Sequence, residues 1–143
     1  MKKMIVAFAM IFALSFAASA DDYAIPFAQL PQVSQTFVQT HFKDVNVALS
    51  MRDSHSFEVR FEDGTEVEFD HVGKWKEVDC KYKALPASVL ELVPAGIPTY
   101  VTTNFPQSII TKVNVKAWGY EVELNNGLDL EFNKAGAFLR IDD

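Results

Sequence analysis

Carboxylates dominate the side chains that could do chemistry in this sequence, and many of them recur at every second position. They gather between residues 58 and 70 and again between residues 121 and 131. Alternation at period two places such residues on one face of a β-strand. Dense carboxylates could act as acid and base, but nothing singles out two of them as a glycosidase pair. Calcium prefers oxygen ligands, and without an EF-hand loop the acidic turns Asp63-Gly64 and Asp142-Asp143 are its candidate ligands.

The other reactive groups do not form a catalytic motif. His41, His55 and His71 fall near a helix end and two turns without metal-site spacing, which favours ordinary surface histidines. Cys80 is the single cysteine, so no intramolecular disulfide can form. A small buried hydrophobe is the favoured role for Cys80, with a reactive or intermolecular thiol as the alternative. The sequence has no P-loop, dinucleotide fingerprint, nucleophile elbow or HExxH helix, so we expect no enzyme.

Two aromatic residues share the predicted acidic face. If Val78 and Ile141 point to the core, alternation places Trp75 and Phe138 on the acidic side. Large rings often anchor protein interfaces, so this face is a candidate binding surface, with an inert solvated face as the alternative. The candidate partner-binding residues are Trp75, Phe138, Arg60, Glu68, Glu131 and Arg140.

The acidic strands belong to a pattern that returns at a constant offset of 63 in residue number, which indicates two copies of one structural unit. Two residues related by this offset are called repeat equivalents. The first strand of each copy matches better at an offset of 64, pairing Val45 with Ile109 and Leu49 with Val113. One residue is therefore expected to be gained before that strand and lost after it. The repeat equivalents are Phe57-Glu58-Val59 with Tyr120-Glu121-Val122, Gly64 with Gly127, Glu68-Phe69 with Glu131-Phe132, Gly73 with Gly136, and Asp79 with Asp142.

Each copy predicts one helix followed by a four-stranded antiparallel meander. The first helix is expected from Pro31 to Lys43 or Asp44, and the second begins near Pro98 after a short helical turn at residues 87–92. Asp63-Gly64 and Asn126-Gly127 are hairpin signals because glycine accepts a positive φ. The fold class is α+β, with the helices covering the apolar face of the strands. The expected core residues are Phe57, Phe61, Phe69, Tyr120, Leu124, Leu130 and Phe132.

The first twenty residues read as a secretory signal, with Lys2 and Lys3 before an apolar run and Ala18-Ser19-Ala20 as the cleavage site. The protein is therefore expected to be periplasmic or secreted, without membrane insertion after cleavage. Removal of the signal leaves 11 basic and 19 acidic side chains, a net charge of −8, which disfavours nucleic acid. The predicted organisation is signal peptide 1–20, N-terminal extension 21–29, first repeat 30–80, linker 81–92 and second repeat 93–143.

The duplicated motifs resemble a known family. Each copy contains aromatic-Glu-Val, Asp-Gly or Asn-Gly, Glu-x-Glu-Phe or, in the second copy, Asp-x-Glu-Phe, then Gly-x-aromatic and an aliphatic residue before Asp. Given twice after a signal peptide, these motifs are similar to those of the PepSY-like, beta-lactamase-inhibitor-protein-like periplasmic proteins of Bacteroidetes. The resemblance covers about residues 30–143 and implies tandem units that build a curved antiparallel sheet with helices on one face. The namesake inhibitors grip an enzyme with their concave sheet. This chain lacks their disulfides, so inhibition of beta-lactamase does not carry over.

Two functional hypotheses follow. The first is an exported, non-catalytic binding or inhibitory module that engages an unknown protein partner through the open sheet face. The alternative is a periplasmic sensor or carrier that responds to a small ligand or to calcium. No cofactor is expected, with calcium as the one alternative.

Overall fold

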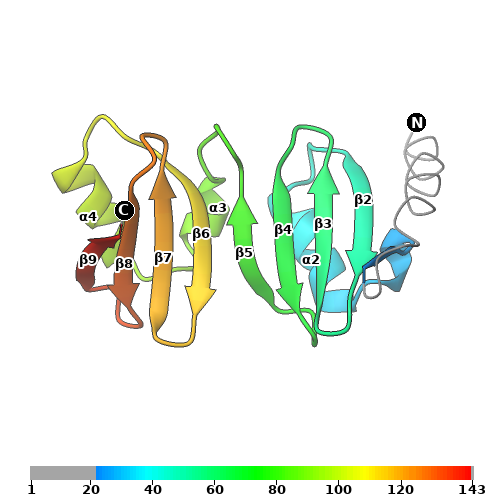
Figure 1. The fold of residues 1–143 in the computed structure, drawn as a ribbon. Helices are drawn as coiled ribbons and strands as arrows, with labels where there is room; N and C mark the ends of the chain where they lie inside the picture. Colours follow the sequence, from blue (N-terminus) through cyan, green and yellow to red (C-terminus); the bar gives the residue numbers. More distant parts are fainter. Residues whose placement is uncertain (1–21, 143) are drawn as a thin grey trace. The chain divides into compact units, whose positions relative to one another are not determined.

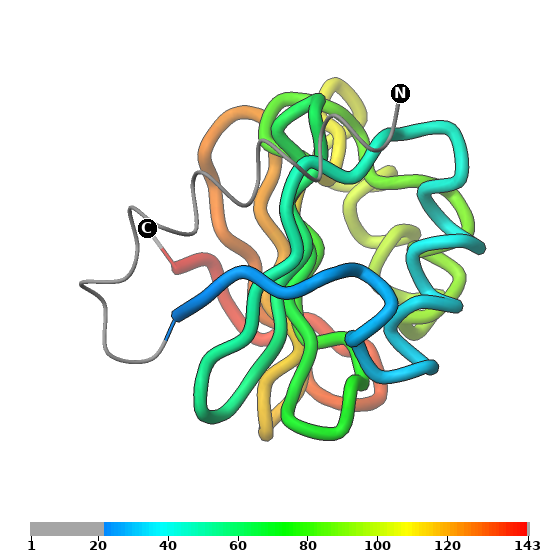
Figure 2. The backbone as a smooth tube through the Cα atoms, turned by 90° about the vertical axis from the view of Figure 1, so that its right-hand side faces the viewer, coloured from blue at the N-terminus to red at the C-terminus, as the bar shows by residue number. Residues whose placement is uncertain are grey.

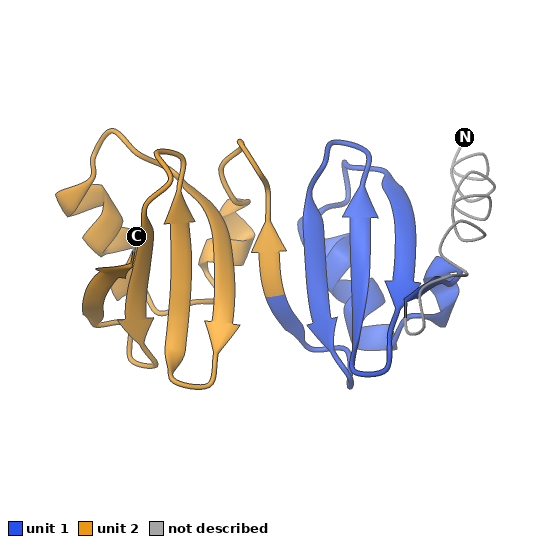
Figure 3. Ribbon diagram, in the orientation of Figure 1, with its two compact units in different colours: residues 1–76 blue, residues 77–143 orange. Residues whose placement is uncertain are grey.

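The computed structural model describes residues 22–142 and contains a mixed fold of a few helices and nine antiparallel strands, in chain order (Figure 1). The predicted signal peptide lies outside the described residues. Among residues 22–142 no helix is long and apolar enough to cross a membrane. The chain forms two compact units, residues 1–76 and 77–143, which divide within one strand (Figure 3).

The first unit, unit 1, combines one α-helix with strands that pair antiparallel in chain order. Figure 2 shows its helix on one side of its strands. Its elements are β1 (Tyr23–Ala24), the 3-10 helix η2 (Phe27–Gln29), α2 (Gln32–His41), β2 (Val47–Arg52), β3 (Ser56–Phe61), β4 (Glu66–Asp70) and the first residues of β5 (Trp75–Asp79).

The second unit, unit 2, follows the same course. The remainder of β5 pairs antiparallel with the strand after the helices, and each later strand pairs with its neighbour in the chain. Its elements are α3 (Ala87–Leu90), α4 (Gly96–Asn104), β6 (Ile110–Lys116), β7 (Gly119–Leu124), β8 (Asp129–Asn133) and β9 (Phe138–Asp142). The helix that the sequence places near Pro98 begins two residues earlier, because a proline is tolerated anywhere in the first turn.

In each unit the apolar face of the strands packs against the main helix. Val59, Val67 and Phe69 are fully buried in unit 1, and Leu130 and Phe132 are fully buried in unit 2. The predicted core residues Phe61 and Leu124 are buried as well, whereas Phe57 and Tyr120 are only half-buried. The alternation in β3, β4, β7 and β8 thus predicted the buried face correctly.

The start of each main helix contacts the last hairpin turn of its own unit. In unit 1 the hydroxyl of Ser34 donates a hydrogen bond to the carbonyl of Gly73 at 2.7 Å. In unit 2 a Cβ on Gly136, whose φ is +91°, would lie 2.6 Å from Cβ of Pro94. The two turns therefore need glycine both for the positive φ and for the close approach of the helix.

The strand after the main helix of each unit, β2 or β6, carries a β-bulge. The predicted shift of this strand to an offset of 64 is wrong. The register breaks between Val47 and Leu49 in unit 1 and between Ile110 and Lys112 in unit 2. Beyond the bulge Ser50 lies opposite Val59, as its repeat equivalent Val113 lies opposite Val122. The offset stays the same along the whole strand, because the extra residue of a bulge occurs in both units.

Candidate functional site

The open face of unit 2, on the side of its strands opposite α4, carries acidic side chains on neighbouring strands. Glu121 lies directly across from Glu131, and Glu123 lies across from Asp129. Asp142 of β9 faces Asp129 from the other side. Directly opposed like charges repel each other, so the strand register gathers carboxylates where they destabilise one another.

Three of these carboxylates form a cluster, which we call the carboxylate cluster: Glu121, Glu131 and Asp142. One oxygen of each lies within 4.8 Å of the others. Glu131 is only 5% exposed, and one of its oxygens pairs with Nη2 of Arg140 at 3.1 Å. The Arg140 side chain is 70% exposed, so solvent screens this ion pair. A neighbouring hollow of about 220 Å³ is lined by Lys112, Asn114, Glu121, Glu123 and Asp129.

The surroundings of Glu121 in the carboxylate cluster shift its pKa. Partial burial raises the pKa of the Glu121 carboxyl, and the negative charge of Asp129 raises it further. Lys116, whose Nζ lies 4.0 Å from the carboxylate, opposes this shift, and Glu131 and Asp142 add to it. The arrangement is therefore short of positive charge, which is the condition under which a bound cation is stabilised.

The open face of unit 1 has a different charge balance. Arg60 is the repeat equivalent of Glu123, and its Nε lies 2.9 Å from an oxygen of Glu58 and 3.9 Å from an oxygen of Glu66. Glu58 in turn lies across from Glu68. Unit 1 therefore has a positive charge at the position where unit 2 has the negative charge of Glu123.

The prediction that Trp75 and Phe138 lie on the acidic face is wrong. Phe138 pairs with Phe132 across a register break, and it stacks on Tyr100 of α4 with ring centroids 4.3 Å apart. Trp75 stacks on Phe37 of α2 in the same manner, at 6.0 Å. The bulge in the β8–β9 pair changes the alternation, so Phe138 faces the helix although Ile141 also faces that side.

The structure places the other candidates as follows. Arg60 and Glu68 lie on the open face of unit 1, and Glu131 and Arg140 meet on that of unit 2. Cys80 is buried, as the sequence favoured.

The two acidic turns that the sequence offers as candidate calcium ligands differ in their surroundings. Oδ1 of Asp63 accepts a hydrogen bond from the N–H of Thr65 at 2.9 Å, which stabilises the hairpin turn. Asp142 lies in the carboxylate cluster, whereas Asp143 is outside the described residues. Sequence reasoning missed that Glu121 and Glu131 accompany Asp142, although pairing the strands in register would have brought them together.

The comparison with known proteins identifies the family. Residues 55–140 match the family model described as "Putative beta-lactamase-inhibitor-like, PepSY-like". The chain belongs to the PepSY-like family. None of the curated proteins matches this PepSY-like chain.

Solved structures of similar proteins agree with this assignment. A "putative periplasmic protein" from Bacteroides vulgatus is 40% identical, with a TM-score of 0.79 over 87% of this chain and 99% of that one. A second protein from the same organism, of unknown function, is 31% identical, with a TM-score of 0.78 over 85% and 99% of the two chains. These relatives confirm the predicted family and the periplasmic or secreted location.

A third relative carries information about a ligand. It is described as a "putative calcium-regulated periplasmic protein" from Bacteroides thetaiotaomicron. It is 40% identical to the PepSY-like chain, with a TM-score of 0.79 over 85% of this chain and 97% of that one.

Proposed function

We propose that this PepSY-like protein is a non-catalytic, periplasmic binding protein that binds calcium at the carboxylate cluster of unit 2. The observation that carries the proposal is the approach of the Glu121, Glu131 and Asp142 carboxylates to within 4.8 Å of one another. Calcium takes six to eight oxygen ligands at about 2.3–2.6 Å, so bidentate carboxylates and waters would complete its shell. The description of the Bacteroides thetaiotaomicron relative as calcium-regulated supports the same ligand.

The bound ion would relieve the repulsion between the clustered carboxylates. Because Arg140 is mostly exposed, its guanidinium can leave Glu131 at little cost when calcium arrives. Magnesium demands a tighter, nearly octahedral shell and dehydrates reluctantly, so calcium should bind in preference to magnesium.

Thermal unfolding with and without calcium tests this proposal. At a free calcium concentration of 100 times the dissociation constant, binding should raise the free energy of unfolding by about 2.7 kcal/mol. The variant Glu121→Gln should lose most of this increase. The matched control is Glu58→Gln, at the repeat equivalent of Glu121, which should keep it. An equal response of the two variants, or no response of the wild type, would contradict the proposal.

A second candidate function is protein binding through the open faces, which the inhibitor-like description of the family favours. On this proposal Arg60, Glu68, Glu131 and Arg140 provide the contacts, and the duplicated helix-plus-meander units serve as the scaffold. Trp75 and Phe138 would then act indirectly, because both rings support the helices from inside.

Capture of periplasmic proteins on the immobilised chain tests this second candidate. The double variant Arg60→Glu, Arg140→Glu should lose any specific partner, and the control Arg52→Glu should retain it. Arg52 is a suitable control because its guanidinium lies 5.6 Å over the ring of Phe57, on the other face. Identical sets of proteins on both variants would count against this surface.

A further inference from the structure

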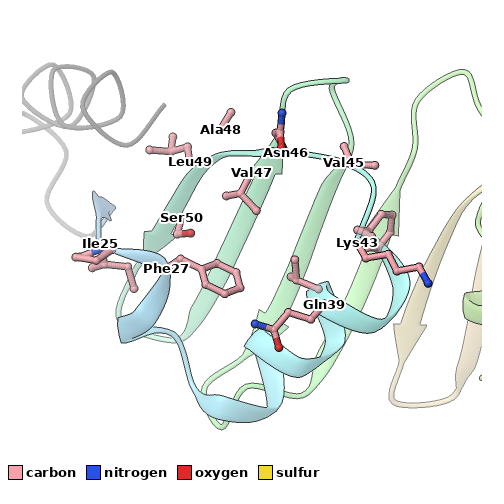
Figure 4. Close-up of a pocket in the computed structure, with 13 residues that line it drawn as sticks. Ile25, Phe27, Gln39, Lys43, Val45, Asn46, Val47, Ala48, Leu49 and Ser50 are labelled. Atoms are coloured by element: carbon pink, nitrogen blue, oxygen red, sulfur yellow. The ribbon is translucent and has the colours of Figure 1, made fainter. Parts of the chain in front are cut away.

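Unit 1 contains an open cavity of about 340 Å³ between η2, α2 and β2 (Figure 4). Its volume falls within the roughly 300–1,000 Å³ of small-molecule sites. The lining is mainly apolar. The residues that the argument uses are Ile25, Phe27, Val38, Phe42, Val47 and Ser50.

A buried hydroxyl lies in this apolar lining. Ser50 is 4% exposed and is one of the residues that line the cavity. Figure 4 shows Ser50 and Val47 pointing from β2 toward Phe27 and the helix. A few polar groups in an apolar lining fix the orientation of a ligand, and the Ser50 hydroxyl can donate a hydrogen bond to, or accept one from, a polar atom that enters the cavity.

The charge around the cavity restricts the ligand. Lys43 is its one charged lining residue, and that side chain is exposed and points away from Phe27 and Ser50 in Figure 4. An ionised group placed beside Ser50 would therefore be desolvated without a counter-ion. The ligand is thus neutral, with an apolar body and one hydrogen-bonding group.

The equivalent positions of unit 2 carry larger aliphatic side chains. Val113, the repeat equivalent of Ser50, is fully buried, and Ile110, the repeat equivalent of Val47, is 6% exposed. Serine and valine in unit 1 are thus smaller than the valine and isoleucine at the repeat-equivalent positions of unit 2. Unit 2 folds with the larger side chains, so small residues at these positions are not a requirement of the fold.

We propose that the cavity of unit 1 binds a small neutral amphiphile, an alkyl or aryl body with one hydroxyl or carbonyl group that hydrogen-bonds to Ser50. The apolar body packs against Phe27, Val38 and Phe42. This site is in the other unit from the carboxylate cluster, so the inference does not depend on calcium binding.

Titration of the mature chain with 1-alkanols, followed by amide NMR shifts, tests the proposal. With 1-octanol, saturable shifts should be confined to residues 25–27 and 38–50. Each added methylene from 1-butanol onward should tighten binding about fourfold until the cavity is full. Ser50→Ala should weaken binding roughly two- to tenfold at every chain length, because it removes one neutral hydrogen bond.

Cavity filling provides the second test. Val47→Phe should abolish the alkanol shifts, whereas the control Val72→Phe, a valine in an exposed turn, should leave them unchanged. Shifts spread over both units, no saturation, or equal binding by Val47→Phe would overturn the proposal. If Val47→Phe does not fold, Ser50→Ala decides: unchanged affinity for 1-octanol would overturn it. All titrations contain a calcium chelator, so failure here is distinguishable from failure of the calcium proposal.

Discussion

At the scale of single residues, the difference between the two open faces comes from charge exchanges at equivalent positions. The clearest of them places Arg60 in unit 1 where unit 2 has Glu123. A carboxylate oxygen of Glu58 consequently lies 2.9 Å from Nε of Arg60. Glu121 instead pairs with Lys116 at 4.0 Å, and burial and its acidic neighbours outweigh this cation and raise the pKa of Glu121.

This raised pKa makes the stability of the protein depend on pH. The folded state raises the pKa of Glu121 above its ordinary value of 4.5, so the favourable contribution is complete below pH 4.5. That contribution is lost as the pH rises through the raised pKa. Without calcium, Glu121→Gln should therefore be more stable than the wild type at pH 7, with a difference that shrinks toward pH 4. Urea unfolding at a series of pH values measures this difference, and a constant or inverted difference would refute it.

At the scale of elements, alternation predicted the strands and their buried faces but could not reveal the bulges. Leu49 and Val113 both look like core residues, which suggested the offset of 64. In the structure Ser50 takes the inner position of Val113, and Leu49 lies opposite Arg60. A bulge adds one residue with no distinctive side chain, so the pattern alone gives no sign of it.

The same effect explains the error at the last strand of unit 2. Leu139 interrupts the alternation there, and Phe138 therefore shares a face with Phe132. Prediction of the carboxylate cluster would have required the register of three strands, and prediction of the cavity would have required the three-dimensional packing of η2. Neither could be read from spacing, although the serine at the position equivalent to Val113 was a visible signal.

The close approach of α4 to the last hairpin turn leads to a prediction at this scale. Gly127 and Gly136 have φ near +90°, so an alanine at either position is strained by roughly 1–2 kcal/mol. At Gly127 the new methyl group meets nothing within 4 Å, whereas at Gly136 it lies 2.6 Å from Cβ of Pro94. Gly136→Ala should therefore lower the free energy of unfolding by about 1–3 kcal/mol more than Gly127→Ala. Equal losses in chemical unfolding would show that helix and turn are not in tight contact.

At the scale of the whole molecule, the two units share a set of contacts and differ in what they present. The T-shaped pair of Phe37 with Phe69 has its equivalent in Tyr100 with Phe132, at 5.7 and 5.6 Å. A shared framework allows each unit to change a separate feature without loss of its core. Unit 1 retains a cavity beside Ser50, and unit 2 concentrates carboxylates on its open face.

Calorimetric titration of the mature protein with calcium chloride tests the central claim most directly. We predict one calcium ion per chain, with little heat from magnesium. The heat should disappear in the double variant Glu121→Gln, Asp142→Asn and persist in Glu58→Gln, Asp79→Asn, which changes the repeat equivalents in the first copy. No heat in the wild type, or equal binding by the two double variants, would contradict a calcium site at the carboxylate cluster.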